Sequence, residues 1–166
     1  LRNEELRVIS TAEIDKGTTV SEYARRNNAV VAINGDFFDD KRIPIGLAVG
    51  PCGRWEATED TKREGVLAID EDRARIYAPS GVLTELDQLE AAVSGWPMLV
   101  SNCKPIPSAQ LSGSDKFTRS PHPRTAVGLS TDRRRLFLVV AEGRLEGVPG
   151  LTLGQLAYFM ANTLKV

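Results

Sequence analysis

The chain has 166 residues, of which 42% are hydrophobic and 26% are charged. This composition is typical of globular proteins and excludes collagen-like, fibrous and intrinsically disordered chains. The 21 Lys and Arg side chains nearly balance the 22 Asp and Glu side chains, so the net charge predicts neither a nucleic-acid partner nor an anionic membrane surface. The length fits a single domain over residues 1–166.

The charge is unevenly distributed along the chain. Residues 115–144 carry seven basic and three acidic side chains, whereas residues 1–114 carry 13 basic and 18 acidic ones. The basic segment is therefore either a solvated, Arg-rich hairpin or a local anion-binding site. The sequence has no apolar run of the roughly 18 residues that a membrane span needs, and it lacks the basic-then-apolar start of a signal peptide.

The two cysteines, Cys52 and Cys103, fit no CxxC or Cys/His spacing, and the single histidine cannot complete a zinc site with them. We therefore expect no structural zinc site, and the sequence identifies no cofactor. A disulfide between the two cysteines is compatible with the sequence but is not implied by it.

The first predicted element is a helix over Ser21–Asn27, which begins where Thr19 forms a capping box with Glu22. Seven short runs with strand periodicity follow. These runs are Ala29–Asn34, Ile43–Val49, Val66–Ile69, Arg73–Ala78, Met98–Val100, Arg124–Ser130 and Arg135–Ala141. The turn at residues 70–72 predicts a half-exposed hairpin from the third and fourth runs, and residues 131–134 join the last two.

The sequence also predicts how these elements are buried. Ala29–Asn34 and Arg135–Ala141 are nearly all apolar, as in buried strands, and the second is expected to be central in its sheet. Pro105–Pro123 has four prolines and no periodicity, which predicts a long surface loop. A capping box begins a second helix over Thr152–Asn162, whose apolar face consists of Leu153, Leu156, Ala157 and Met160. The fold class is therefore α+β, a sheet-rich mixed single domain with two main helices packed on the sheets.

Two of the predicted strands have one face made of small residues. These residues are Gly46, Ala48 and Gly50 in the first strand, and Ala126, Gly128 and Ser130 beside Arg124 in the second. Such a face permits close approach by a packed helix, by another backbone or by a ligand, and these alternatives stay open. A guanidinium at the end of a shallow face needs a partner, which favours an anion bound by Arg124.

Polar and aromatic side chains follow the first predicted strand. The Asn34 amide can bond to a sugar hydroxyl, and Phe37 and Phe38 can form an apolar wall, although both would also suit a core. His122 lies between two prolines at the start of another strand, and a histidine in such a place is more often a solvated loop residue than a catalyst.

Six motifs occur in order between about residues 21 and 161. They are Asn34-Gly35-Asp36-Phe37-Phe38-Asp39, Ile45-Gly46-Leu47, Ser94-Gly95-Trp96-Pro97-Met98-Leu99-Val100, Pro123-Arg124-Thr125-Ala126-Val127-Gly128, Val139-Val140-Ala141-Glu142-Gly143-Arg144 and Gly150-Leu151-Thr152-Leu153-Gly154-Gln155-Leu156-Ala157. In this order they resemble the phosphodiester glycosidase family. Asp36 stands where the family usually has a second glycine, and aspartate tolerates left-handed backbone better than most residues.

The family also continues past the second helix into a strand and an Asp-Gly-Gly-Gly-Ser loop. We therefore expect this chain alone to be poorly stable, to form oligomers through an exposed sheet edge or to need a companion fragment. An extracytoplasmic or secreted location is a further implication of the resemblance.

The resemblance implies hydrolysis of a sugar-1-phosphodiester, in which water replaces the phosphate at the anomeric carbon. Phosphate is a good leaving group, so a cation can substitute for much of the acid that ordinary glycosidases use. We expect Arg124 to hold the phosphate with Thr125, and Glu142 to position water. Arg144 is the second cation, and Asp36 is the second catalytic carboxylate. The other implied substrate-binding residues are Asn34, Phe37, Phe38, Gly46, Trp96 and His122.

The implied site residues are expected to line a single cavity, so Asn34 and Arg124 should lie in the same site. Three alternatives stay open. Glu142 and Arg144 would also fit an exposed salt pair at a strand end. The chain could be a non-catalytic module that binds phosphorylated glycans or cell-envelope polymers. A metal-dependent phosphoesterase would use the carboxylates of Asp36, Asp39 and Asp40, but these lack the spacing and glycine of a calcium loop.

Overall fold

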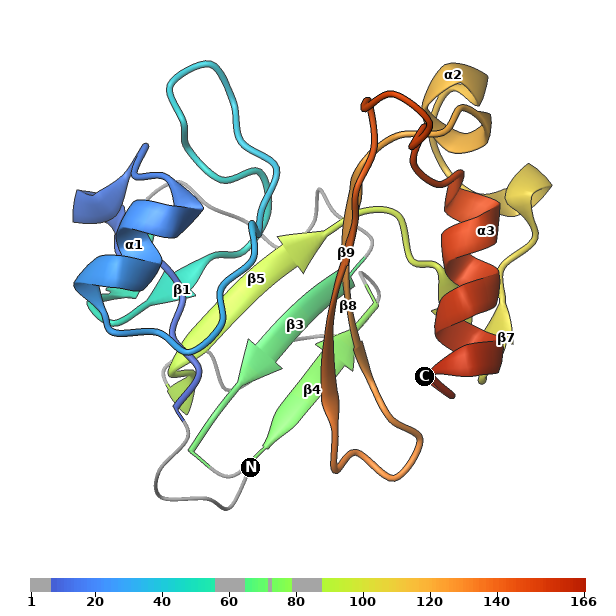
Figure 1. Ribbon diagram of the computed structural model, residues 1–166. Coiled ribbons are helices and arrows are strands. Elements are labelled where there is room, and N and C mark those ends of the chain that lie inside the picture. Colours follow the sequence, from blue (N-terminus) through green and yellow to red (C-terminus); the bar gives the residue numbers. More distant parts are fainter. Residues whose placement is uncertain (1–6, 56–64, 72, 79–87) are drawn as a thin grey trace. The chain divides into compact units, whose positions relative to one another are not determined.

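The computed structural model describes residues 7–55, 65–71, 73–78 and 88–166 (Figure 1). The chain divides into two compact units, Leu1–Trp96 and Pro97–Val166. Both units contain antiparallel strands and helices, which confirms the predicted α+β class. The prediction of a single domain over residues 1–166 stays a prediction.

A five-stranded antiparallel sheet forms the centre of the first unit. Its strands, in sequence order, are β1 Val49–Gly50, β2 Gly53–Arg54, β3 Gly65–Ile69, β4 Ala74–Tyr77 and β5 Ala91–Gly95. In space the order is β2-β1-β5-β3-β4, so β5 lies between β1 and β3 (Figure 1). The core that stabilises this sheet is made by Leu47, Val49, Val66 and Ala92, with Leu89 packed against them.

The predicted hairpin of the third and fourth runs is confirmed as β3 and β4. Asp70 holds its turn, because its Oδ1 atom accepts the Arg73 N–H at 2.7 Å while its own N–H donates to the Arg73 carbonyl at 3.0 Å. The prediction for Ile43–Val49 is wrong over most of its length, since only Val49 belongs to β1. Gly46 has a φ of +108°, which breaks the extended conformation in that run.

The first predicted helix is confirmed as α1, Val20–Arg26, which follows a short 3₁₀ turn, η1, at Glu13–Asp15. The Thr19 hydroxyl accepts the Glu22 N–H at 3.2 Å, as the capping motif requires. The Glu22 carboxylate bonds instead to Arg26, so only half of the predicted capping box is formed.

The prediction of a buried strand at Ala29–Asn34 is wrong. The segment is irregular, and Val30 is 95% exposed. Asn28, which follows the C-cap of α1, has a φ of 51° and so ends the helical conformation. The Ala29 N–H then donates to the Ala24 carbonyl at 2.9 Å. An apolar, β-branched run becomes a strand only where a neighbouring strand pairs with it, and none of the described strands does so here.

The second unit is built on a long hairpin of β8, Arg124–Leu129, and β9, Leu136–Ala141. The two strands pair from Arg124↔Ala141 to Leu129↔Leu136, which confirms the predicted pairing. The expectation that β9 is central and buried is wrong. Among the described strands it pairs with β8 alone, and Val140 is 61% exposed. Its apolar residues alternate between the two faces of a two-stranded sheet.

The second predicted helix is confirmed as α3, Leu153–Tyr158, which continues into a π-helical turn, η5, at Phe159–Thr163. Thr152 and Gln155 form the complete capping box. The predicted apolar face is buried, and its members are Leu153, Leu156, Ala157 and Met160. A Cβ atom at Gly128 of β8 would lie 2.7 Å from the Met160 Cε atom, so this small residue lets the helix pack closely on the hairpin.

The expected loop at Pro105–Pro123 contains regular structure, so that prediction is wrong in part. The segment from residue 100 to residue 119 forms β6 Val100–Ser101, β7 Lys104–Pro105, η4 Ser108–Gln110 and α2 Asp115–Arg119. The Ser114 hydroxyl accepts the Phe117 N–H at 3.3 Å and begins α2. Leu111 and Thr118 are buried, which anchors a segment whose sequence has no periodicity.

Candidate functional site

Among the described residues of the first unit, Asp36 is the titratable group whose surroundings are most unusual. The Asp36 Oδ1 atom accepts the backbone N–H of Ser94 at 2.6 Å, and Ser94 is the fourth residue of β5. The Ser94 hydroxyl donates in turn to the Leu47 carbonyl at 2.8 Å, and the Ser94 residue is buried. The irregular segment that carries Asp36 is thereby tied to the central strand of the sheet.

Burial raises the pKa of the Asp36 carboxyl to about 7. Hydrogen bonds from the backbone N–H groups of Ser94 and of Asp36 itself act in the opposite direction, because they stabilise the charged form. Desolvation is the larger effect, so the carboxyl exchanges a proton near neutral pH. A carboxyl group with this property is suited to acid–base chemistry.

The backbone at Asp36 does not adopt the left-handed conformation that was expected from its replacement of a glycine. Asp36 is absent from the residues with positive φ, and so is Gly35. A Cβ atom at Gly35 would lie 3.0 Å from the Val93 side chain, so closeness to β5 restricts this position. Asp36 therefore replaces the family glycine without backbone strain.

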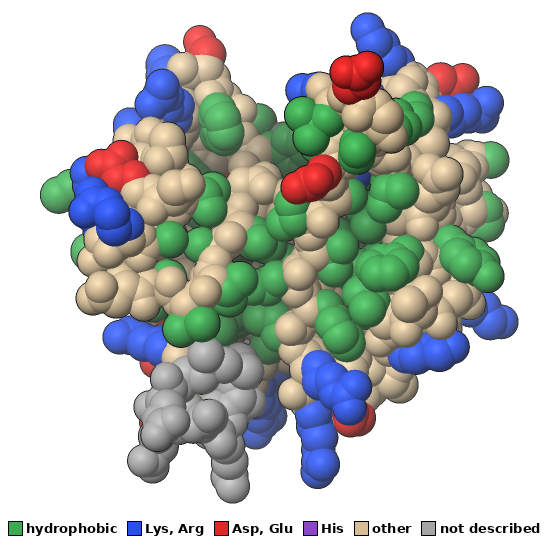
Figure 2. Space-filling model, viewed as in Figure 1, with side chains coloured by type: hydrophobic (Ala, Val, Ile, Leu, Met, Phe, Trp, Pro, Cys, Tyr) green, Lys and Arg blue, Asp and Glu red, His purple; other side chains and the backbone are tan. Residues whose placement is uncertain are grey.

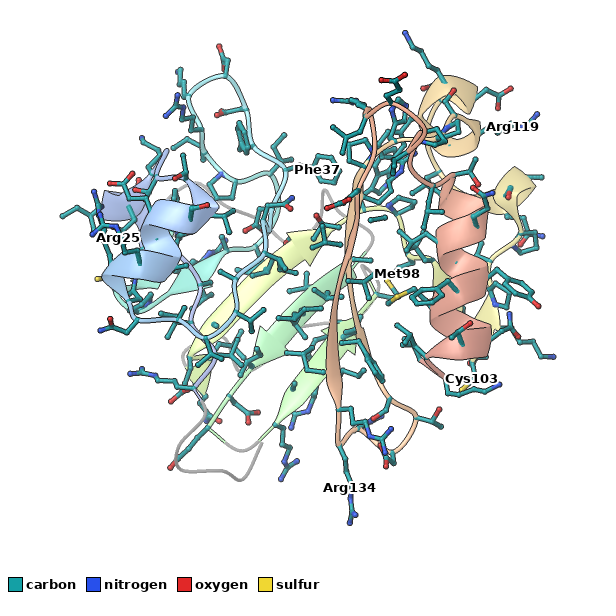
Figure 3. The ribbon with its side chains drawn as sticks, viewed as in Figure 1. Arg25, Phe37, Met98, Cys103, Arg119 and Arg134 are labelled. Carbon is teal, nitrogen blue, oxygen red and sulfur yellow. The ribbon has the colours of Figure 1, made fainter. Side chains whose placement is uncertain are left out.

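Aromatic side chains follow Asp36 directly in the sequence. The ring of Phe37, which is labelled in Figure 3, lies 6.4 Å from the ring of Trp96, and the two rings meet edge to face at 76°. Phe38 is 65% exposed, and Phe37 is also exposed. Exposed aromatic rings beside a buried carboxyl provide an apolar surface that suits the C–H face of a sugar.

The loop from residue 37 to residue 46 brings two more predicted residues to this region. The Ile45 N–H donates to the Phe37 carbonyl at 2.7 Å, which closes the loop just before Gly46. Gly46 is buried with a positive φ, so a side chain at this position would be strained. Asn34 is exposed at the start of the same stretch.

The carboxylate cluster considered for a metal does not assemble among the described residues. The Asp39 Oδ1 atom accepts the N–H groups of Lys41 at 2.9 Å and Ile43 at 2.8 Å, so it caps a turn. No group of three His, Cys, Asp or Glu side chains able to hold a metal ion is found in the described part of the chain.

Arg124 lies at the start of β8 in the second unit, and it is buried. Its Nε atom donates to the Leu151 carbonyl at 3.2 Å, and its Nη2 atom donates to the carbonyls of Phe117 at 2.5 Å and Ser120 at 3.2 Å. The guanidinium also lies 4.8 Å from the centre of the Phe117 ring. The sequence analysis predicted that the Arg124 guanidinium needs a partner, and backbone carbonyls largely fill this role.

Two other predicted residues flank Arg124. The His122 backbone pairs with Leu151 in both directions, at 3.1 Å and 3.0 Å, and its ring Nε2 atom lies 3.4 Å from the Lys116 carbonyl. Thr125 is half-buried and pairs with Val140 across the hairpin. His122 is therefore part of the connection between β8 and the segment before α3.

Glu142 and Arg144 follow β9, and both are exposed. Arg144 has a φ of 62°, a left-handed conformation that is uncommon for a long side chain. Burial and the nearby charge of Arg144 both lower the pKa of Arg124. Two cations close enough to repel one another form an electropositive region that suits an anion such as phosphate.

The predicted site residues thus form two groups, one in each unit. Asn34, Asp36, Phe37, Phe38, Gly46 and Trp96 belong to the first unit, and His122, Arg124, Thr125, Glu142 and Arg144 belong to the second. The expectation that Asn34 and Arg124 line one cavity stays a prediction. Ser94 was not singled out from the sequence as a site residue, although its motif was noted, because a short Ser-Gly pair does not reveal a contact with Asp36.

No helix in the described part of the chain is both long and apolar enough to span a bilayer. Cys52 and Cys103 are exposed free thiols.

Comparison with known proteins agrees with the motif order. A search of curated proteins gave no match. The family model described as phosphodiester glycosidase matches residues 27–165, which is most of the chain and includes both groups of site residues. The chain therefore belongs to the phosphodiester glycosidase family.

Proposed function

We propose that this protein hydrolyses a sugar-1-phosphodiester and releases the sugar and a phosphomonoester. The family gives the general class of glycosidase. The observation that carries the finer proposal is the Asp36 carboxyl, which has a pKa of about 7 and lies beside exposed aromatic rings. A carboxyl whose pKa is close to the working pH transfers protons to and from water efficiently.

In the proposed reaction, the ionised Asp36 carboxylate removes a proton from water while the water oxygen bonds to the anomeric carbon. The bond between that carbon and the phosphate oxygen breaks, and its electron pair leaves with the phosphomonoester. The proton on Asp36 then passes to solvent. Phosphate is weakly basic compared with a sugar alkoxide, so its departure needs little help from a second carboxylic acid.

Asp36 takes the role that the sequence first suggested for Glu142. Burial raises the pKa of Asp36, whereas Glu142 is exposed to water. Arg144 is proposed as the main phosphate-binding cation, with Thr125 as a donor. Arg124 is proposed to contribute its charge, since its Nε and Nη2 atoms already donate to backbone carbonyls.

The aromatic rings of Phe37, Phe38 and Trp96 are proposed to contact the sugar ring, and the Asn34 amide is proposed to bond to a sugar hydroxyl. The exposure of Phe38 supports this assignment for the aromatic rings, because 65% of this residue is accessible to solvent. Gly46 and His122 are proposed to shape the binding surface through their backbone.

The test is turnover of a chromogenic sugar-1-phosphodiester by Asp36→Asn and by Asp40→Asn. Asp40 is an exposed carboxylate in the same loop and provides the matched control. We expect Asp36→Asn to lower kcat by about 10²- to 10⁴-fold, the usual contribution of a general base. Asp40→Asn should stay near the wild-type rate. Wild-type activity in Asp36→Asn would overturn the assignment.

A second experiment identifies the bond that is broken. Hydrolysis in ¹⁸O-water should place the label in the released sugar, because water attacks the anomeric carbon. Label in the phosphomonoester would instead identify attack at phosphorus and contradict the proposal. Tight binding of the diester without any turnover would favour the non-catalytic module.

A further inference from the structure

The tip of the β8–β9 hairpin carries a dense group of exposed cations. It consists of Arg133, Arg134 and Arg135 in the turn, and of Lys165, which lies against the turn. The Thr131 hydroxyl donates to the Lys165 carbonyl at 3.1 Å and so fixes Lys165 beside the arginines. We call these four residues the basic tip. In Figure 2, blue side chains gather at this end of the hairpin, and Arg134 extends away from it in Figure 3.

None of the four residues of the basic tip forms an ion pair in the described part of the chain. The carboxylate of Asp132 interacts electrostatically with Arg135 and Arg134, but this single negative charge leaves the four cations in excess. Asp132, the acidic residue within the turn, is used to hold the backbone. Its Oδ1 atom accepts the Ser130 hydroxyl at 2.5 Å and the Arg134 N–H at 3.1 Å. The whole chain has a net charge of −1, so the basic tip is a local feature.

Hydrogen bonds hold the turn that presents these cations. The Arg133 N–H donates to the Ser130 carbonyl at 2.7 Å, and the Arg135 N–H donates to the Ser130 hydroxyl at 3.0 Å. Arg133 and Lys165 have φ values of 57° and 58°, a region that glycine or asparagine enters at lower cost. Two cations therefore occupy positions where local backbone energy favours other residues, which suggests that their charge is used.

The basic tip lies at the opposite end of the hairpin from Arg124 and Arg144. Six paired residues separate the two ends, which corresponds to about 20 Å of strand. This distance exceeds the reach of a single sugar-1-phosphodiester. A guanidinium group forms paired hydrogen bonds with phosphate oxygens, and the tip has three of them in succession.

We infer that the substrate is a polymer of sugars joined by phosphodiesters, and that the basic tip binds phosphates of this polymer away from the bond that is cut. This inference rests on the proposed function and narrows its substrate class. A polymer presents regularly spaced anions, so one chain can contact the cations at both ends of the hairpin. The tip then adds affinity without taking part in the reaction.

The test compares a synthetic oligomer of sugar phosphates, long enough to span the hairpin, with the methyl diester of a single sugar phosphate. The tip variant is Arg133→Asn, Arg134→Gln and Arg135→Gln, because asparagine tolerates the left-handed backbone at position 133. The control variant, Arg7→Gln, Lys16→Gln and Arg25→Gln, removes the same charge from exposed positions of the first unit.

We expect the tip variant to bind the oligomer about tenfold more weakly in low salt, and we expect the difference to shrink as salt is added. Its kcat/KM for the oligomer should fall to the same extent, and turnover of the single diester should not change. The control variant should behave as the wild type in both assays. A circular dichroism spectrum like that of the wild type would show that the tip variant is folded.

Equal affinity of the wild type and the tip variant for the oligomer would overturn the inference. So would equally tight binding of single-stranded DNA with the same number of phosphates, or of vesicles containing anionic lipid, since the tip would then be a general polyanion surface. Direct binding is measured without turnover. Failure of the wild type to cleave either compound would therefore count against the proposed function, while the oligomer affinities would still test the basic tip.

Discussion

Asp36 is held in a protein environment that disfavours its charge, even though two backbone N–H groups stabilise that charge. Raising its pKa to about 7 means that the folded protein binds a proton there more tightly than the unfolded chain does. Protonation of Asp36 therefore stabilises the fold at acidic pH, and this contribution is lost as the pH rises towards 7. Above pH 7, the buried charge costs about 4 kcal/mol at most.

The first prediction concerns this cost. Asp36→Asn removes the titrating group but keeps an oxygen that can accept the Ser94 N–H. We expect this variant to gain stability relative to the wild type as the pH is raised from 5 to 8. Urea denaturation at several pH values measures the effect. Asp40→Asn should follow the wild-type curve, and a constant difference between Asp36→Asn and wild type across this range would contradict the raised pKa.

The second prediction concerns Ser94, whose hydroxyl donates to the Leu47 carbonyl from a buried position. Ser94→Ala leaves that carbonyl without its donor and should lower the free energy of unfolding by about 1–3 kcal/mol. Loosening β5 also weakens the Ser94 N–H bond that lowers the Asp36 pKa. The pH profile of activity should therefore shift to higher pH, a change that a purely structural loss would not produce.

The exposed hydroxyl of Ser101 in β6 provides the control. Ser101→Ala should change neither the free energy of unfolding nor the pH profile. If Ser94→Ala lowered stability but left the pH profile unchanged, Ser94 would be a structural residue with no effect on the carboxyl of Asp36.

At the scale of elements, Arg124 connects three segments of the second unit. Arg124 is the first residue of β8. Its guanidinium donates hydrogen bonds to the carbonyls of Phe117 in α2, of Ser120 just after α2 and of Leu151. These bonds form between a charged donor and backbone carbonyls, and each contributes about 1 kcal/mol or somewhat more. Arg124 is thus a structural residue of the second unit, whatever it also contributes to phosphate binding.

The third prediction follows from these bonds. Arg124→Ala should lower the free energy of unfolding by about 2–4 kcal/mol. Arg124→Lys should recover less than half of this loss, because an ammonium group lacks the planar set of donors. Arg119→Ala is the matched control, since the interaction of Arg119 among the described residues is an exposed pair with Asp115 at 3.4 Å. Equal stability of the Arg119 and Arg124 alanine variants would contradict the structural role. Thermal and urea denaturation both provide the measurement.

The sequence predicted the elements that local signals define. The Thr152 capping box and the apolar face of α3 are local patterns, and the β8–β9 hairpin combines two apolar runs with a short polar turn. β5 was not predicted, because its Ala, Ser and Gly residues have little strand preference, although it is central in the sheet. Its position depends on pairing with β1 and β3, which no short stretch of sequence encodes.

The candidate site shows the same limit. The order of the motifs identified Asp36 as the residue that replaces a glycine of the family, and it identified the aromatic residues that follow Asp36. The contact between Asp36 and Ser94 joins residues 58 positions apart, and burial decides the pKa of that carboxyl. Burial of a side chain depends on the packed sheet and not on its neighbours in sequence. For Arg124, the sequence indicated that a partner was needed but could not show that backbone carbonyls supply it.

At the scale of the whole molecule, the family match runs from residue 27 to residue 165 and crosses the boundary between Trp96 and Pro97 without interruption. The second unit has about 70 residues, a size at which a single core seldom provides more than a few kcal/mol. Both facts support the prediction that residues 1–166 fold as one cooperative domain.

The last prediction tests this cooperativity. Trp55 and Trp96 both belong to the first unit, so intrinsic tryptophan fluorescence reports on its unfolding. Tyr158 is an exposed residue of α3, and Tyr158→Trp in a Trp55→Phe, Trp96→Phe background reports on the second unit. We expect the urea midpoints from the two reporters to coincide, after correction for the stability change caused by each substitution, because a small unit without its neighbour would be marginally stable. Two separate transitions would show that the units fold independently and would contradict the single domain.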